Sequence, residues 1–427
     1  AHPDAPIVLS VGDAALIYRR RRYALGLGCA RGCPPEEMIG LVGRTLAGAG
    51  IAHGDISAVY SIDLKSDEAA VHAMADHLGV EARFFTPAQL ERELPRLANP
   101  SDVVFAEVGC HGVAEGAALA ACGPDGALVV EKTKSTRATC ALARGAVRPP
   151  CGRARGRLAV IGIGPGAATW RTPEATRLIA EADELVGYGL YLDLLGPLAA
   201  KTPRKSFKLG DEEARCRYAL EAAGAGRNVA LISSGDAGIF AMGALVAELL
   251  DRPEDAGGVS AAARRVDVIN VPGISALQAA SARAGALLGH DFCAISLSDL
   301  LTPRAQILRR LNAAADGDFV IAFYNPVSRR RRTLLAEARR ILLQHRPPDT
   351  PVLLASNLGR PEEALRRRTL DTLAVDEVDM LTVVLVGATQ SRAFQTGDLN
   401  AGVEGWRMYT PRGYAHKKTV ALSSEEI

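Results

Sequence analysis

Short apolar runs alternate with helical patterns along most of the chain. Helical spacing of apolar residues is visible in Ile274–Ala284 and Ser328–Gln344, and Thr172 and Pro173 offer a hydroxyl N-cap and a first-turn proline to another helix. Six apolar runs have the length of strands: Leu158–Ile161, Asn228–Ser233, Val266–Val271, Phe319–Phe323, Val352–Ala355 and Leu381–Val386. This alternation predicts an α/β domain whose helices cover the faces of a sheet.

The first part of the chain shows the same alternation. Helices are predicted at Pro35–Ala49 and Glu68–Leu78, and strands at Tyr23–Leu27, Ile56–Ile62, Arg83–Thr86 and Leu128–Glu131. Residues 146–156 carry proline, glycine and arginine without apolar periodicity, which is typical of a linker. We therefore expect an α/β protein with a small domain over residues 1–145, a linker over 146–156 and a larger unit over 157–427, each unit long enough for its own core.

Composition narrows the class of partner. The formal net charge of the 427 residues is only +2, so the charge balance favours neither nucleic acid nor a membrane surface. No apolar run reaches the roughly 18–20 residues of a membrane span, and no leader pattern opens the sequence. The 8 cysteines are scattered, with Cys29 and Cys33 as a lone pair. We expect reduced thiols, no metal site and a cytoplasmic location.

Four glycine-rich or turn-forming segments follow predicted strands. The first segment, Gly162-Ile-Gly-Pro-Gly166, is similar to the glycine-rich turn of a dinucleotide-binding site. However, Pro165 lacks the backbone N–H that would bind a phosphate, and no acidic residue ends a second strand about twenty residues further on. A purely structural turn is the alternative. The other three are Ser233-Ser-Gly-Asp-Ala-Gly-Ile-Phe240, Val271-Pro-Gly-Ile-Ser275 and Phe323-Tyr-Asn-Pro326. Together they predict a ligand site at the carboxyl edge of a sheet.

The ordered set of four turns resembles the tetrapyrrole methyltransferase family over roughly Arg157 to Phe394. Ser296-Leu-Ser-Asp-Leu-Leu-Thr-Pro303, Asp379-Met380 and Thr410-Pro-Arg-Gly-Tyr414 are similar to the branch that methylates precorrin-3B at C(17) and contracts the ring to precorrin-4. The resemblance implies a two-lobed α/β fold, S-adenosylmethionine in a cleft between the lobes, and a homodimer. Arg304 and Ala388-Thr-Gln390 depart from the family pattern.

The same resemblance implies individual site residues. Gly166, with Pro165, would face the tetrapyrrole. The positions implied for the cofactor are Pro165, Gly235, Asp236, Ala237, Ile239, Ser275, Tyr324 and Asn325. A substrate with acidic side chains needs cations, and arginine can hold a carboxylate at two points. The candidates in one cationic segment are Lys208, Arg215 and Arg217, for which a charged, solvated loop and helix is the alternative.

Ring contraction, as the branch implies it, requires a group that moves a hydroxyl proton. Glu213 and Asp236 are the candidate catalytic residues, although Asp236 could instead tie the backbone of its own turn. Methyl transfer itself chiefly needs alignment, so no catalytic triad is required. The same reaction on cobalt-factor III, a cobalt chelate, is the alternative that no residue in the sequence excludes.

Residues Tyr23 to Arg144 resemble a small cobalamin-synthesis domain that forms the C-terminus of cobalt-precorrin-5A hydrolase and also occurs as a separate protein. Lys65, Glu68, His111 and Glu115 are predicted either to line a tetrapyrrole pocket or to serve as structural caps. A second hypothesis for the chain is therefore a tetrapyrrole carrier, in which fusion raises the effective concentration of a precursor. Other cobalamin-pathway enzymes are the expected partners.

Overall fold

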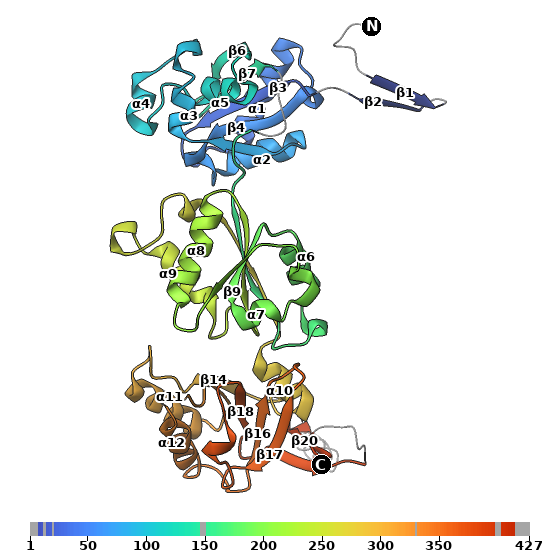
Figure 1. Cartoon of the computed structure of the whole chain (residues 1–427), viewed down its shortest axis with the longest axis vertical. Helices are drawn as coiled ribbons and strands as arrows, with labels where there is room; N and C mark the ends of the chain where they lie inside the picture. The colour runs from blue at the N-terminus through green and yellow to red at the C-terminus, as the bar shows by residue number, and fades with distance from the viewer. Residues whose placement is uncertain are drawn as a thin grey trace, which may run out of the picture.

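The computed structural model describes residues 7–11, 14–18, 21–145, 151–328, 331–397 and 403–414. Three α/β bodies follow one another along its long axis (Figure 1). Each body is built on a five-stranded sheet with helices on both faces. The predicted α/β class is confirmed, and the predicted two-lobed form corresponds to the second and third bodies, which we call the first lobe and the second lobe.

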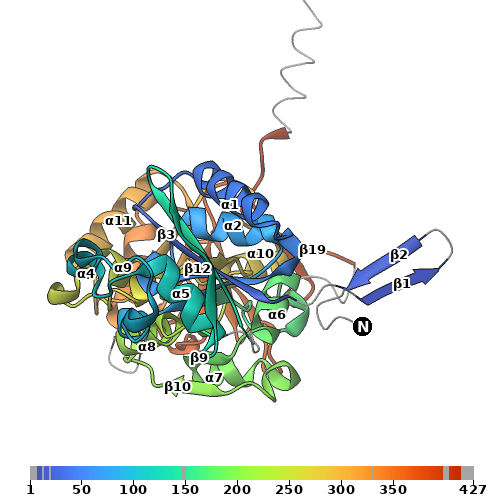
Figure 2. The same cartoon turned by 90° about the horizontal axis from the view of Figure 1, so that it is seen from above.

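The N-terminal domain has the sheet order β5-β4-β3-β7-β6. Its strands are β3 (Tyr23–Cys29), β4 (Ile56–Ile62), β5 (Ala82–Phe85), β6 (Ala127–Lys134) and β7 (Ala138–Arg144). Helices α1 (Pro35–Ala49) and α2 (Ala69–Leu78) cover one face, and α5 (Val113–Cys122) covers the other, beside the short α3 (Pro87–Glu91) and α4 (Asp102–Val108). A separate hairpin, β1 (Ile7–Val11) and β2 (Ala14–Tyr18), projects from the body (Figure 2).

The first lobe has a fully parallel sheet of order β10-β9-β11-β8-β12. Its strands are β8 (Arg157–Gly162), β9 (Glu184–Tyr188), β10 (Arg204–Phe207), β11 (Asn228–Ser233) and β12 (Asp267–Val271). Helices α6 (Pro173–Ala180) and α7 (Gly189–Asp193) pack on one face, and α8 (Glu212–Gly224) and α9 (Met242–Asp251) pack on the other. Because the strands are parallel, the turns that follow them meet at one edge of the sheet.

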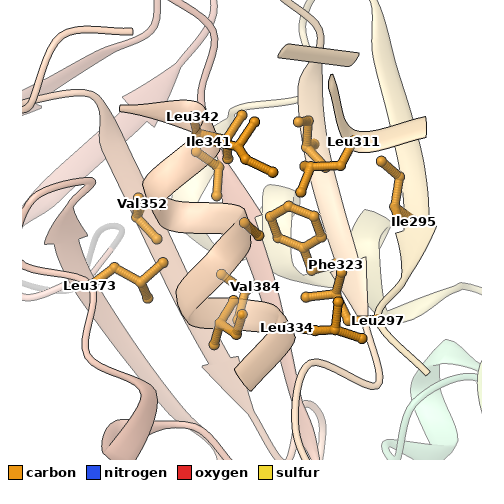
Figure 3. Close-up of a cluster of buried hydrophobic side chains, with 14 of the residues drawn as sticks. Ile295, Leu297, Leu311, Phe323, Leu334, Ile341, Leu342, Val352, Leu373 and Val384 are labelled. Atoms are coloured by element: carbon orange, nitrogen blue, oxygen red, sulfur yellow. The ribbon is translucent and has the colours of Figure 1, made fainter. Parts of the chain in front are cut away.

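The second lobe has a mixed sheet of order β14-β15-β18-β16-β17. Its strands are β14 (Phe292–Ser296), β15 (Val320–Tyr324), β16 (Pro351–Ser356), β17 (Ala364–Thr369) and β18 (Thr382–Val386). Helices α11 (Arg304–Asp316) and α12 (Thr333–Leu342) cover one face, where the ring of Phe323 lies among aliphatic side chains (Figure 3). The other face packs against α10 (Ala276–Ala284) and a small sheet of β13 (Gly285–Ala286), β20 (Trp406–Tyr409) and β19 (Arg392–Gln395).

The predicted linker is held against the N-terminal domain over its second half. Residues 146–150 lie outside the described residues. Arg153 pairs with the backbone of Phe84 through two hydrogen bonds, and its guanidinium lies 2.6 Å from a carboxylate oxygen of Asp63. Gly156 then leads directly into β8. The second half of this segment is therefore anchored rather than free.

Two general expectations can be compared with the structure. All 8 cysteines are free thiols, and burial raises the pKa of Cys29 to about 11, which keeps that thiol protonated. Within the described ranges, no single helix is long and apolar enough to cross a membrane, although the bent pair α4 and α5 passes the same test of length and composition.

Candidate active site

A cavity of about 340 Å³ opens between the first and second lobes, within the size range of small-molecule sites. The first lobe contributes the turns after β8, β11 and β12, and the second lobe contributes residues after β15 and β16 and at the start of β18. Seven of the eight predicted cofactor residues line it: Pro165, Gly235, Asp236, Ile239, Ser275, Tyr324 and Asn325. The four turns singled out in the sequence therefore converge on one site.

Glycine allows three of these turns to pack on one another. A Cβ on Gly273 would lie 2.2 Å from the carbonyl oxygen of Gly235, and a Cβ on Gly162 would lie 2.5 Å from the same atom. Gly164 and Gly235 also exchange backbone hydrogen bonds of 3.1 and 2.8 Å, and both adopt positive φ. No side chain fits between backbones this close, so glycine is required for the three turns to meet beside the cavity, where Gly235 is part of the lining.

Asp236 holds two of the turns together. Its Oδ1 accepts a hydrogen bond from the backbone N–H of Gly238 at 2.7 Å, and its Oδ2 accepts one from Gly273 at 2.9 Å. Both oxygens therefore have backbone partners across two turns. This arrangement favours the turn-stabilising alternative for Asp236 over the predicted catalytic role.

A hydroxyl pair joins the turn after β12 to the end of β15. The Tyr324 oxygen accepts from the backbone N–H of Leu277 at 3.0 Å and lies 2.5 Å from Ser275 Oγ. Burial raises the pKa of Tyr324, so the phenol stays protonated and can donate to Ser275. The ring of Phe240 lies 5.2 Å from that of Tyr324, so an aromatic corner forms part of the wall.

Glu213 and Arg217 were predicted at the site, and the structure places both away from the cavity. Arg217 lies 2.9 Å from Glu213 and donates to the carbonyl of Gly257 at 2.7 Å, outside the cavity lining. The reason is helical geometry: residues two apart on α8 point in different directions, so Arg215 faces the cavity while Arg217 does not. The structure does not bring the Glu213 carboxylate to this cavity, and its catalytic role stays a prediction.

Three other predicted residues lie near the cavity without lining it. Lys208 is exposed and offers only its carbonyl, which accepts from Arg215 at 3.0 Å. Ala237 is buried in the core of the first lobe. Gly166 packs between the lobes, where a Cβ would lie 2.7 Å from the carbonyl of Leu358. The ligand contacts predicted for these three residues therefore stay predictions.

Sequence reasoning missed several cavity residues. Arg360 follows β16 and crosses to the first lobe, where its Nε donates to the carbonyl of Pro165 at 3.1 Å. Tyr191, Glu212 and Ser233 also line the cavity. Ser356-Asn-Leu-Gly-Arg360 carries the same signal as the other turns, polar and glycine residues directly after a strand, and this signal predicts a contribution to the site.

The departures from the family pattern lie away from the cavity lining. Arg304 contacts Glu337 and Thr333 across α11 and α12. Thr389 donates from its backbone to Asp318 at 2.9 Å. Among the residues that the structure describes, no group of three or more His, Cys, Asp or Glu side chains is placed to hold a metal ion.

The four polar residues singled out in the N-terminal domain belong to three separate clusters. Glu115 accepts four hydrogen bonds, from the backbones of Ala98, Asn99 and Lys132 and from the Asn99 amide. His111 lies 2.9 Å from Glu91, and Glu68 lies 3.8 Å from Lys65 and 3.5 Å from Arg31. The geometry supports the structural alternative for Glu115.

Comparison with known proteins covers both parts of the chain. Residues 157–374 match the model of the tetrapyrrole (corrin/porphyrin) methylases, and residues 23–143 match the family described as the cobalamin synthesis G C-terminus. These two matches lie on either side of the predicted linker. The crystal structure of the methyltransferase CobJ is similar with a TM-score of 0.53 and 39% identity, covering 60% of this chain and 100% of that one.

Two curated relatives carry different substrate names. The precorrin-3B C(17)-methyltransferase of a Sinorhizobium species is 40% identical over 263 residues, which are 61% of this chain and 98% of that protein. The cobalt-factor III methyltransferase of Priestia megaterium is 42% identical over 273 residues, which are 64% of this chain and 48% of that protein. The chain thus spans nearly all of the first relative and about half the length of the second.

Proposed function

Because residues 157–374 make this chain a member of the tetrapyrrole (corrin/porphyrin) methylase family, we propose that it methylates C(17) of a cobalamin precursor with S-adenosylmethionine as the methyl donor. The predicted resemblance of both parts of the chain is confirmed by the family matches. The observation that carries the proposal is the convergence of the four turns on one cavity between the lobes.

The lining of the cavity fits a donor of this kind. Ser233 lines the cavity and is 3% exposed, and its Oγ has no hydrogen-bond partner among the described residues. A buried hydroxyl without a partner is costly, so a polar ligand group at this position would satisfy it. Ile239, Phe240 and Met242 supply apolar surface on the same wall. When bound, S-adenosylmethionine would supply an electrophilic methyl group.

The residues of this chain would act mainly by alignment. Methyl transfer is an in-line displacement, and holding two reactants in line removes much of the entropic barrier. Ser275 and Tyr324 join the turn after β12 to β15, and Arg360 joins the second lobe to Pro165. These contacts would hold the two walls at a set separation, while the Tyr324 and Phe240 rings would favour a positively charged donor.

Ring contraction after methylation would need a proton acceptor near the macrocycle. Glu212 and Asp236 are the carboxylates that line the cavity. Asp236 has both oxygens bonded to backbone N–H groups, whereas Glu212, among the described residues, accepts from the backbone of Gly210 at 3.1 Å and lies 3.9 Å from Arg215. We therefore assign the proton-transfer role to Glu212 within this proposal.

Precorrin-3B is the substrate that we propose, with precorrin-4 as the product. A second candidate is cobalt-factor III, because relatives of similar identity carry that name. The N-terminal domain would act as an accessory domain that binds or passes on the precursor. We also propose a homodimer, for which the exposed apolar side chains of Phe394 and Tyr409 on the small sheet offer a surface.

The test is incubation of the purified chain with S-adenosylmethionine and each macrocycle in separate reactions. Methyl transfer would be followed by mass spectrometry and by transfer of a labelled methyl group. We expect a methylated, ring-contracted product from precorrin-3B and inhibition by S-adenosylhomocysteine. Methyl transfer to cobalt-factor III alone would make that compound the substrate in place of precorrin-3B. Methyl transfer to neither macrocycle would refute the proposed methyltransferase activity. Light scattering would measure the molar mass in solution and so test the proposed homodimer.

A further inference from the structure

Arg215 lines the cavity and carries a buried donor that has no partner among the described residues. Its side chain is buried, with 2% of the residue exposed, and its Nε has no partner among the described residues. Its other donors contact the carbonyl of Lys208 at 3.0 Å and the sulfur of Met242 at 3.7 Å. The nearest carboxylate, Glu212, is 3.9 Å away, at the limit of an ion pair. A buried guanidinium with so little compensation needs an anion.

Arg360 brings a second positive charge to the same cavity from the opposite lobe. Its Nε donates to the carbonyl of Pro165, and one terminal nitrogen lies 3.5 Å from Ser234 Oγ. Within the described part of the chain, no carboxylate forms an ion pair with it. The guanidinium therefore bonds only neutral oxygen atoms, and its charge is left for a ligand.

Tyr191 lines the same cavity as the two arginines. Burial raises the pKa of Tyr191, and the charges of Arg360 and Arg215 both act in the opposite direction on the same hydroxyl. Tyr191 also lines the cavity, so a protonated phenol is available as a further donor.

We propose that Arg215, Arg360 and Tyr191 form a carboxylate-binding subsite that is completed only when the two lobes face each other. The proposal rests on the proposed function, since both of its reactants carry carboxylates: the amino-acid end of the methyl donor and the acidic side chains of the macrocycle. Two guanidinium groups and a phenol suit a carboxylate, because each oxygen can accept several charge-assisted hydrogen bonds. The ligand would therefore join one lobe to the other.

The test compares Arg360→Gln and Tyr191→Phe with the wild type by calorimetry. The probes are S-adenosylhomocysteine and 5′-deoxy-5′-methylthioadenosine, which shares the nucleoside but lacks the carboxylate. The KM for the tetrapyrrole is measured in parallel. If the subsite holds the methyl donor, Arg360→Gln lowers the affinity for S-adenosylhomocysteine roughly tenfold to a hundredfold and leaves the affinity for methylthioadenosine unchanged. If it holds the macrocycle, both nucleosides bind as before and the tetrapyrrole KM rises by a similar factor.

Arg217→Gln is the matched control, because it removes an arginine charge from the same helix as Arg215 but outside the cavity. Arg360→Lys should restore part of the lost affinity, since the charge returns without the planar fork. Equal weakening of both nucleosides together with a lower Tm would mean a structural role and overturn the proposal, as would unchanged affinities and KM. Failure of the wild type itself to bind S-adenosylhomocysteine would instead count against the proposed function.

Discussion

Glu115 in the N-terminal domain and Arg215 in the first lobe are both buried charged residues on helices, yet their surroundings differ. Glu115 receives four hydrogen bonds from the protein, whereas Arg215 lines a cavity and its Nε has no partner in the described part of the chain. A buried charge that is saturated by backbone N–H groups stabilises the fold. A buried charge that is left open toward a cavity indicates a ligand, because its burial is otherwise uncompensated.

The largest effect should come from the open charge. Arg215→Met keeps much of the buried volume but removes the guanidinium donors of a residue that lines the cavity. We expect kcat/KM to fall roughly 10- to 100-fold, the size expected for losing a charge-assisted contact. Stability should change by less than about 2 kcal/mol, since replacing a poorly paired buried charge by an apolar side chain is often neutral. A large fall in the free energy of unfolding with unchanged kcat/KM would instead show that Arg215, like Glu115, stabilises the fold.

The saturated charge should show the opposite pattern. Glu115→Gln keeps the shape but replaces one acceptor oxygen by a donor, so backbone N–H groups lose their partner. We expect the free energy of unfolding, measured in urea, to fall by about 1–3 kcal/mol, while kcat/KM stays within about twofold of the wild-type value. A fall in kcat/KM without loss of stability would show that Glu115 contacts a ligand after all.

The pH dependence of stability should also show that Glu115 stabilises the fold. Burial by itself would raise the pKa of Glu115, but the hydrogen bonds from Lys132, Asn99 and Ala98 lower the pKa below its usual value. The stabilisation from Glu115 is therefore present above the unfolded pKa of about 4.3 and is lost as the pH falls through the lower folded value. Between pH 7 and pH 3, the free energy of unfolding measured in urea should fall more steeply with decreasing pH for the wild type than for Glu115→Gln. Identical slopes would contradict this assignment.

A moderate effect is expected at Asp236, which lines the cavity but is bonded to its own turns. Asp236→Asn leaves one acceptor for two backbone donors, so we expect a loss of about 1–2 kcal/mol in stability and a severalfold higher KM for S-adenosylmethionine. Thermal unfolding and initial rates would measure both. If stability is unchanged while kcat falls steeply, the catalytic interpretation of Asp236 is correct.

The smallest effects belong to the charges on the far side of α8. Glu213→Gln and Arg217→Ala remove a partly exposed ion pair, and such pairs contribute about 0–1 kcal/mol. We expect kcat/KM within about twofold of the wild type for both variants. A tenfold loss in Glu213→Gln would restore its predicted catalytic role and break the distinction between the two sides of the helix.

Much of the secondary structure followed from local patterns. The helix Pro35–Ala49 and the strands Ile56–Ile62 and Asn228–Ser233 were predicted at their observed bounds. The strand β7 was missed, because Ala138–Arg144 is alanine-rich and carries one β-branched residue. Its place is decided by pairing with β3 and β6, which no local pattern reveals.

By itself, the sequence determined the α/β class, the family and the turns that meet at the cavity, because glycine, proline and polar residues after apolar runs act locally. Only the tertiary structure decided which charges reach the cavity. Arg215 and Arg217 are two residues apart in the same segment, and the helix turns one inward and the other outward. Arg360 lies 195 positions beyond Pro165, and only the packing of the second lobe against the first brings its guanidinium to that carbonyl.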